Sequence, residues 1–172
     1  MSDPGGRYRV ELLGEQHDRT AFSCGVEALD RYFHRQAGQD MRRNVAVVFV
    51  AVDRESGAAA GYYTLSTIAF HPKSVPEALR QRLPRYDLLP AMLIGRLAID
   101  RHYQGQGLGK ALLSNALRRC RKLSTEIGAI GVIVDAKDDH ARAFYERFPF
   151  IRFVDEEHRL LIPMGTIDRL LA

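Results

Sequence analysis

Three glycines between a predicted strand and a predicted helix constrain this chain more than any other feature. The mostly apolar run over residues 91–100 predicts a strand. After it, apolar residues recur at helical spacing, at Leu108, Ala111, Leu112, Ala116, Leu117 and Cys120. Gly105, Gly107 and Gly109 follow the strand and lie at the amino end of the helix. Free backbone N–H groups and the helix dipole attract anions at such a turn, so the sequence predicts a phosphate-binding site there.

The rest of the pattern predicts a mixed α/β single domain with a central sheet. Ser23 is positioned to cap a helix whose apolar residues are Val26, Leu29, Phe33 and Ala37. Residues 45–53 and 60–70 predict a hairpin joined by the turn 54–57. Ser74 and Glu77 form a capping-box pattern, which predicts a short helix to about Leu83. Residues 84–90 then predict a loop.

The last third of the chain predicts a strand, a helix and a closing pair of strands. Residues 130–136 have the composition of a buried strand. Asp138 or Asp139 can cap the following helix, whose apolar face is Ala141, Phe144, Tyr145 and Phe148. Residues 151–154 and 160–164 predict the closing strands, which complete a layered α/β arrangement.

Composition excludes several classes of protein. Of the 172 residues, 46% are hydrophobic and 27% are charged, which argues against wholesale disorder and coiled coils. The longest apolar run, 45–52, is well short of the roughly 18 residues that a membrane span needs. The first residues have no apolar export segment, and the two cysteines, Cys24 and Cys120, lie far apart. We therefore expect a reduced, cytosolic protein without a bound metal.

Basic residues gather in one stretch of the chain. The net charge is 25 − 21 = +4, and between Arg101 and Lys122 there are six lysines or arginines and no aspartate or glutamate. A solvated helix face is the ordinary origin of such a run, and a nearby phosphate-bearing ligand is the alternative.

Two well-known phosphate-binding motifs do not fit the glycine turn. A P-loop would need glycine at 104 and serine or threonine at 111, where this chain has Gln104 and Ala111. A dinucleotide-binding fingerprint would need its third glycine at 110, where Lys110 stands.

The spacing Gln104-x-x-Gly107-x-Gly109 instead resembles the pyrophosphate-binding signature of the GNAT superfamily of acyl-CoA-dependent N-acetyltransferases. Residues 143–148, Ala-Phe-Tyr-Glu-Arg-Phe, are similar to the second motif of that family. The resemblance implies one domain over 1–172, with a core of about 8–168, and a twisted, mostly antiparallel sheet of about six to seven strands flanked by about four helices. It also implies acetyl-CoA as cofactor, bound by Leu97, Ala98, Ile99, Gln104, Gly105, Gln106, Gly107, Leu108, Gly109, Lys110 and Tyr145.

The same resemblance implies how the reaction is catalysed. Backbone amides from Gln106 to Lys110 would hold the pyrophosphate, and Tyr145 would be the general acid that protonates the leaving thiolate. From the residues alone, Tyr145 would be a core tyrosine with a satisfied hydroxyl. No strong general base is evident, and Asp135 and Glu126 are the candidates.

A longer resemblance, over roughly 22–164, is to the TacT, AtaT and ItaT type of toxin within the GNAT superfamily. It rests on residues 22–33, 61–65 and 93–100, and the chain departs from that branch at Pro149, where a glycine is usual. It implies acetylation of the α-amine of aminoacyl-tRNA and neutralisation by a ribbon-helix-helix antitoxin. Arg80, Arg82 and Arg85 are the expected tRNA contacts, although each alone could be an ordinary surface charge.

Two alternatives stay open at this point. A stand-alone acetyltransferase for a small amine or a peptide N-terminus would have an acidic acceptor groove. A non-catalytic, acetyl-CoA-binding regulator would have no need of Tyr145. The sequence does not decide whether the chain forms a homodimer.

Overall fold

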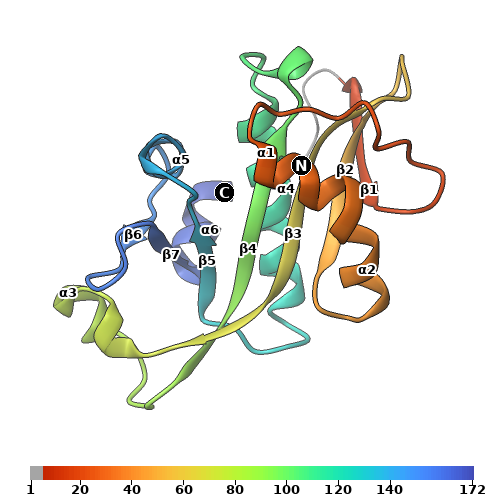
Figure 1. The fold of residues 1–172 in the computed structure, drawn as a ribbon. Helices are drawn as coiled ribbons and strands as arrows, with labels where there is room; N and C mark the ends of the chain where they lie inside the picture. Colours follow the sequence, from red (N-terminus) through yellow and green to blue (C-terminus); the bar gives the residue numbers. More distant parts are fainter. Residues whose placement is uncertain (1–5) are drawn as a thin grey trace. The chain divides into compact units, whose positions relative to one another are not determined.

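The computed structural model describes residues 6–172, and its elements form a mixed α/β fold (Figure 1). In chain order the strands are β1 (Tyr8–Leu12), β2 (Val47–Asp53), β3 (Ala59–Phe70), β4 (Leu89–Ile99), β5 (Gly131–Asp135), β6 (Ile151–Arg152) and β7 (Arg159–Pro163). The helices are α1 (Glu27–Arg31), α2 (Ala37–Arg42), α3 (Glu77–Arg80), α4 (Leu108–Leu123), α5 (Asp139–Tyr145) and α6 (Met164–Leu171).

Hydrogen bonds order the strands as β1-β2-β3-β4-β5-β7-β6. The pairs β1·β2, β2·β3, β5·β7 and β6·β7 are antiparallel, and β4·β5 is parallel. The predicted mixed α/β class with a mostly antiparallel sheet of six to seven strands is therefore confirmed.

The chain divides into two compact units, which we describe separately. The first contains the described residues up to Ser66 together with Gly95–Ala116. The second contains Thr67–Ile94 and Leu117–Ala172. That the whole chain is one functional domain stays a prediction.

The first unit is built on the predicted hairpin. β2 pairs with β3 from Val47 opposite Leu65 to Val52 opposite Ala59, with a bulge at Ala51 and Val52. β1, which the sequence did not predict, pairs along the other edge of β2. Gly61 on β3 is required by close packing, because a Cβ there would lie 2.8 Å from Ile99 Cδ1 and 3.2 Å from Leu112 Cδ2.

One helical segment covers the core of this unit. α1, a π-helical turn η2 (Tyr32–Gln36) and α2 follow one another without a break, and they correspond to the single helix predicted after Ser23. Phe33 is fully buried and stacks on Tyr62 with ring centroids 4.4 Å apart. The predicted Ser23 cap is wrong: the helix begins at Glu27 with no side-chain cap, and Asp30 accepts a hydrogen bond from the Cys24 N–H instead.

The second unit has its own apolar core. Its buried members come from the end of β3, the α3 region and the strands β4 to β7, and they include Phe70, Val75, Leu79, Leu89, Ile133, Phe153 and Leu161. β5 is flanked on one side by β4, with Met92 opposite Val132, and on the other side by β7, with Val132 opposite Ile162. The predicted Asp138 cap of α5 is confirmed, because its side chain accepts a hydrogen bond from the Ala141 N–H at 2.8 Å.

Two predictions for this unit are wrong. Ser74 does not cap α3; a 3-10 turn (Pro72–Ser74) precedes the helix, and the Ser74 hydroxyl donates to Asp155. α3 ends at Arg80 and not near Leu83. The sequence also did not predict α6, which follows β7 directly. Across residues 6–172, no helix combines the length and apolar character needed to cross a membrane.

Candidate functional site

The predicted glycine turn lies in the first unit, between the end of β4 and the start of α4. A 3-10 turn, η4 (Arg101–Tyr103), follows β4 and is capped by buried Asp100, which accepts from the His102 N–H at 2.8 Å. Gly105 and Gly107 have φ values of +76° and +82°, a region that favours glycine. α4 begins directly afterwards at Leu108.

This turn is an open cradle for an anion. A Cβ at Gly105 or Gly107 would have no atom within 4 Å, so the space above the backbone is free. The first N–H groups of an α-helix such as α4 have no acceptor within the helix, and the Ala111 N–H donates to Gly107 O at 3.1 Å. These N–H groups and the helix dipole fit a pyrophosphate.

The Gln104 side chain fixes the turn in place. Its Nε2 donates to Ile99 O at 2.8 Å and to Cys24 O at 2.9 Å. The amide thereby ties the turn to the end of β4 and to the segment before α1. These contacts give the amide a positioning role, and cofactor binding by Gln104 stays a prediction.

The predicted pantetheine contacts on β4 are continuous with this turn. Ala98 is buried, whereas Leu97 and Ile99 are half-buried. The strand is held in the first unit by hydrogen bonds from Arg96 N–H to Thr64 Oγ1 and from Asp100 N–H to Ala60 O. The structure therefore brings all the predicted cofactor residues from Leu97 to Lys110 together in one unit.

Tyr145 lies in the second unit, as the last residue of α5. It is 4% exposed and packs edge to face against Phe144 and Phe150, with ring centroids 5.3 and 5.6 Å away. Burial, with a smaller contribution from Asp135, raises the pKa of its hydroxyl, which keeps the proton in place at neutral pH. No residue in 6–172 forms a hydrogen bond with this hydroxyl. The hydroxyl therefore lacks the partner within residues 6–172 that a core tyrosine with a satisfied hydroxyl, the alternative, would have.

Neither Asp135 nor Glu126, the two candidate general bases, has surroundings that suit that role. Asp135 is bound by Arg159 through two contacts, Nε to Oδ1 at 2.7 Å and NH2 to Oδ2 at 3.1 Å. Glu126 is exposed after the end of α4. The described residues therefore offer no evident strong base.

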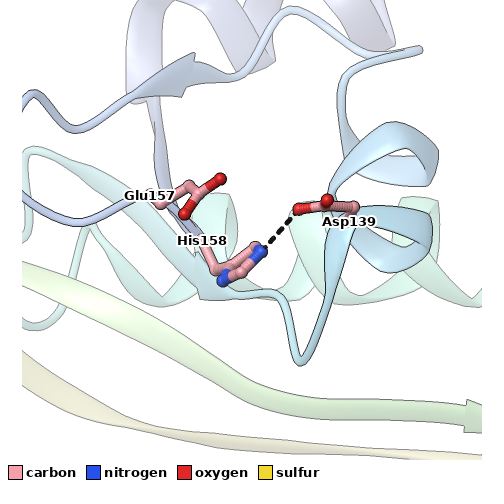
Figure 2. A group of neighbouring side chains, drawn as sticks. All are labelled: Asp139, Glu157 and His158. Carbon is pink, nitrogen blue, oxygen red and sulfur yellow. Dashed lines mark hydrogen bonds and ion pairs between the residues drawn. The ribbon is translucent and has the colours of Figure 1, made fainter.

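Another cluster in the second unit has the residue types of a metal site (Figure 2). His158 Nε2 lies 2.8 Å from Asp139 Oδ1, and Glu157 is their neighbour. Arg142, however, pairs with Glu157 at 3.3 Å and with Asp139 at 3.5 Å. Because Arg142 already pairs with both carboxylates, we interpret this cluster as an ion-pair network.

Two of the three arginines predicted to contact tRNA line a cleft of about 980 Å³ in the second unit. Arg80 and Arg85 line it, together with Lys73 and Tyr86, whereas Arg82 is exposed outside the lining. Its acidic residues include Glu77, which pairs with Arg80, and Asp155, which accepts from Ser74. The cleft is thus mixed in charge and not acidic, with an aromatic ring, that of Tyr86, 69% exposed.

Comparisons with known proteins identify the family of this chain. The model of the acetyltransferase (GNAT) family matches residues 15–150. The chain is 34% identical to the tRNA-acetylating toxin of Mycobacterium tuberculosis (strain ATCC 25618 / H37Rv) over 151 residues. The match covers 87% of this chain and 89% of that protein.

Solved structures are similar over nearly the full chain. A tyrosine-to-phenylalanine mutant of KacT is 31% identical with a TM-score of 0.89, covering 95% of this chain and 99% of that one. AtaT complexed with acetyl-methionyl-tRNAfMet is 29% identical with a TM-score of 0.87, covering 96% and 99%. A mutant AtaT bound to the C-terminus of the antitoxin AtaR and to acetyl-CoA is 27% identical with a TM-score of 0.81, also covering 96% and 99%. The chain therefore belongs to the GNAT family and is an acetyl-CoA-dependent N-acetyltransferase.

Proposed function

We propose that this chain is a toxin that acetylates the α-amine of aminoacyl-tRNA and so blocks translation. The observation that carries the proposal is the likeness, over 96% of this chain, to AtaT in complex with acetyl-methionyl-tRNAfMet. The 34% identity to a tRNA-acetylating toxin supports the same substrate class.

The residues of the glycine turn would hold the cofactor. The N–H groups from Gln106 to Lys110 would bind the pyrophosphate, since both left-handed glycines leave open space above them. Leu97, Ala98 and Ile99 would border the pantetheine arm, and Gln104 would keep the turn in its binding conformation. When bound, acetyl-CoA supplies the acetyl group as an activated thioester.

Tyr145 would move the proton that the reaction needs. Its hydroxyl is protonated at neutral pH, and it has no acceptor within 6–172 that would compete for the proton. A general acid of this kind typically contributes about 10² to 10⁴ in rate.

The lack of an evident base favours an α-amine as acceptor. An α-amine has a pKa of about 7.7 to 8.0 and is partly neutral in the cell, whereas a lysine amine, near 10.4, is almost fully protonated. Asp135 is held in its pair with Arg159, so an acceptor that needs little deprotonation suits this chain.

Two further parts of the proposal concern partners and location. A ribbon-helix-helix antitoxin would neutralise the enzyme, in line with the likeness to AtaT bound to an antitoxin segment. A charged tRNA substrate would place the chain in the cytoplasm. A homodimer stays a prediction.

The proposal is tested by incubating the protein with labelled acetyl-CoA and one of three acceptors: charged total tRNA, the same tRNA after deacylation, or spermidine. We expect label on charged tRNA alone, and none with the Tyr145→Phe variant. Label on spermidine with none on charged tRNA would replace the proposal by the small-amine alternative. Cofactor binding without transfer to any acceptor would favour a regulator.

A further inference from the structure

Arg7, at the start of the first unit, points its charge at the glycine turn. Its NH1 lies 3.3 Å from Gln106 Oε1, although 99 residues separate the two in the chain. Gln106 stands between the two left-handed glycines, and its own Nε2 donates to His102 O at 3.2 Å. The guanidinium is therefore one side chain away from the proposed phosphate cradle.

The surroundings hold this guanidinium in a fixed position. Its carbon Cζ lies 5.3 Å from the ring centroids of both Tyr8 and Tyr103, within range of a cation–π contact. Its NH2 lies 3.3 Å from buried Asp53 Oδ2. Tyr103 belongs to η4, immediately before the glycine turn, so the turn itself helps to position Arg7.

Asp53 has shorter hydrogen bonds than the one from Arg7. It accepts from the Tyr103 hydroxyl at 2.8 Å and from the Glu55 N–H at 3.0 Å, against 3.3 Å for Arg7. Burial opposes its ionisation, but hydrogen bonds from Tyr103, Glu55 and Arg7 outweigh this effect and lower its pKa to about 2. Asp53 is thus an anchor for Tyr103 and Arg7 that remains hydrogen-bonded if the guanidinium turns toward another anion.

Asp53 is the carboxylate that pairs with Arg7, and the glycine turn and α4 add no further acidic residue. The segment from Arg101 to Lys122 contains no aspartate or glutamate. The Arg7 side chain is 45% exposed, and the contacts to Asp53 and Gln106 engage only part of its five-donor fork. A planar fork of this kind suits two oxygens of one phosphate.

We propose that Arg7 binds a phosphate group of acetyl-CoA beside the N–H groups of the turn. This inference rests on the proposed cofactor site at Gln106–Lys110 and is independent of the acceptor. Gln106 acts as the bridge between the turn and the guanidinium. The pyrophosphate and the 3′-phosphate of the cofactor offer the same chemistry, and the experiment below separates them.

Isothermal titration calorimetry of Arg7→Ala with CoA tests the proposal. Loss of a charge-assisted contact is expected to weaken binding by about 10- to 100-fold. Arg9→Ala is the matched control, because Arg9 lies on β1, two residues after Arg7, has a similar exposed fraction, 44% against 45%, and pairs with Glu11. Arg9→Ala should bind CoA with the affinity of the wild type. The CoA affinity of Arg7→Lys should lie between those of Arg7→Ala and Arg9→Ala.

Two further ligands identify the contact. With 3′-dephospho-CoA, an equal loss in Arg7→Ala assigns the contact to the pyrophosphate, and the absence of a loss assigns it to the 3′-phosphate. Acetyl-pantetheine, which carries neither phosphate, should bind wild type and Arg7→Ala equally. A loss of acetyl-pantetheine binding, or unchanged CoA binding in Arg7→Ala, would overturn the proposal.

A variant of the turn separates this inference from the cofactor site itself. If Gly107→Asp abolishes CoA binding while Arg7→Ala does not weaken it, only the role of Arg7 is wrong. If neither change affects binding, the cofactor site at the turn is wrong as well.

Discussion

Tyr145 and Phe150 pack edge to face across the corner that follows α5, with ring centroids 5.6 Å apart. The corner is tight, because the Phe150 N–H donates a hydrogen bond to Phe148 O at 2.7 Å across Pro149. The contact holds the Tyr145 ring through its apolar surface and leaves its hydroxyl available.

Tyr145→Phe should therefore keep the fold and lose turnover. The ring contacts with Phe144 and Phe150 remain, so the midpoint of thermal unfolding and the CoA affinity should match wild type. The acetylation rate should fall by about 10² to 10⁴. Phe144→Tyr, which adds a hydroxyl to the neighbouring ring, is a control for general changes in the aromatic cluster. A rate within threefold of wild type would show that the Tyr145 hydroxyl is not the proton donor.

Gly107→Asp should abolish acetyl-CoA binding, because it places a carboxylate in the open space of the cradle. Gly57→Asp is the matched control: Gly57 also has a left-handed φ, +76°, and an unobstructed Cβ, but it lies in the hairpin turn. Both variants carry the same backbone strain, so calorimetry on the pair isolates the charge effect. Equal affinities in the two variants would contradict a phosphate site at the glycine turn.

Replacing Arg80, Arg82 and Arg85 together by alanine should weaken tRNA binding and leave acetyl-CoA affinity unchanged. The logarithm of the binding constant falls with the logarithm of the salt concentration, and each lost phosphate contact should make this negative slope shallower by about 0.7 to 0.9. Arg9, Arg54 and Arg169 replaced together remove the same charge elsewhere and serve as the control. Filter binding over a salt series measures both effects. A control variant that loses as much affinity as the test variant would point to a general effect of net charge.

The Asp53 carboxylate should make the protein acid-labile. Its pKa is lowered to about 2 in the folded chain, against about 3.9 in an unfolded one. The stabilisation is therefore fully present above about pH 4 and is lost as the pH falls toward 2. Asp53→Asn should lower the free energy of unfolding at pH 7 and reduce its decline between pH 4 and pH 2, as measured by urea denaturation. An unchanged acid profile in Asp53→Asn would contradict this assignment.

Local sequence patterns were sufficient to predict part of the fold. The apolar positions of α4 are buried almost without exception, because helical spacing puts them on one face whatever the partner is. The Asp138 cap likewise depends on an acceptor and an N–H only three residues apart.

Long-range contacts decided the rest. Ser74 was predicted to cap α3, but its hydroxyl bonds to Asp155, 81 residues later in the chain. β1 was missed because Arg9 and Glu11 make it read as polar, although Tyr8 and Val10 alternate with them. α6 was missed because it starts after Pro163 without a side-chain cap that would indicate a helix start.

The same distinction applies to the candidate site. The glycine turn was visible because all its elements are consecutive in the chain. Arg7 was not identified, since its relation to Gln106 exists only after β1 pairs with β2. The alternation of Tyr8 and Val10 was the one available signal for that strand.

The central claim concerns the atom that receives the acetyl group. It is tested most directly by mass spectrometry of charged tRNA that has been incubated with the protein and acetyl-CoA and then digested with nuclease. We predict N-acetyl-aminoacyl-adenosine as the modified product, absent with Tyr145→Phe and absent when the tRNA is deacylated beforehand. Unmodified aminoacyl-adenosine, or an acetyl group on a nucleobase instead of the amino acid, would contradict the account.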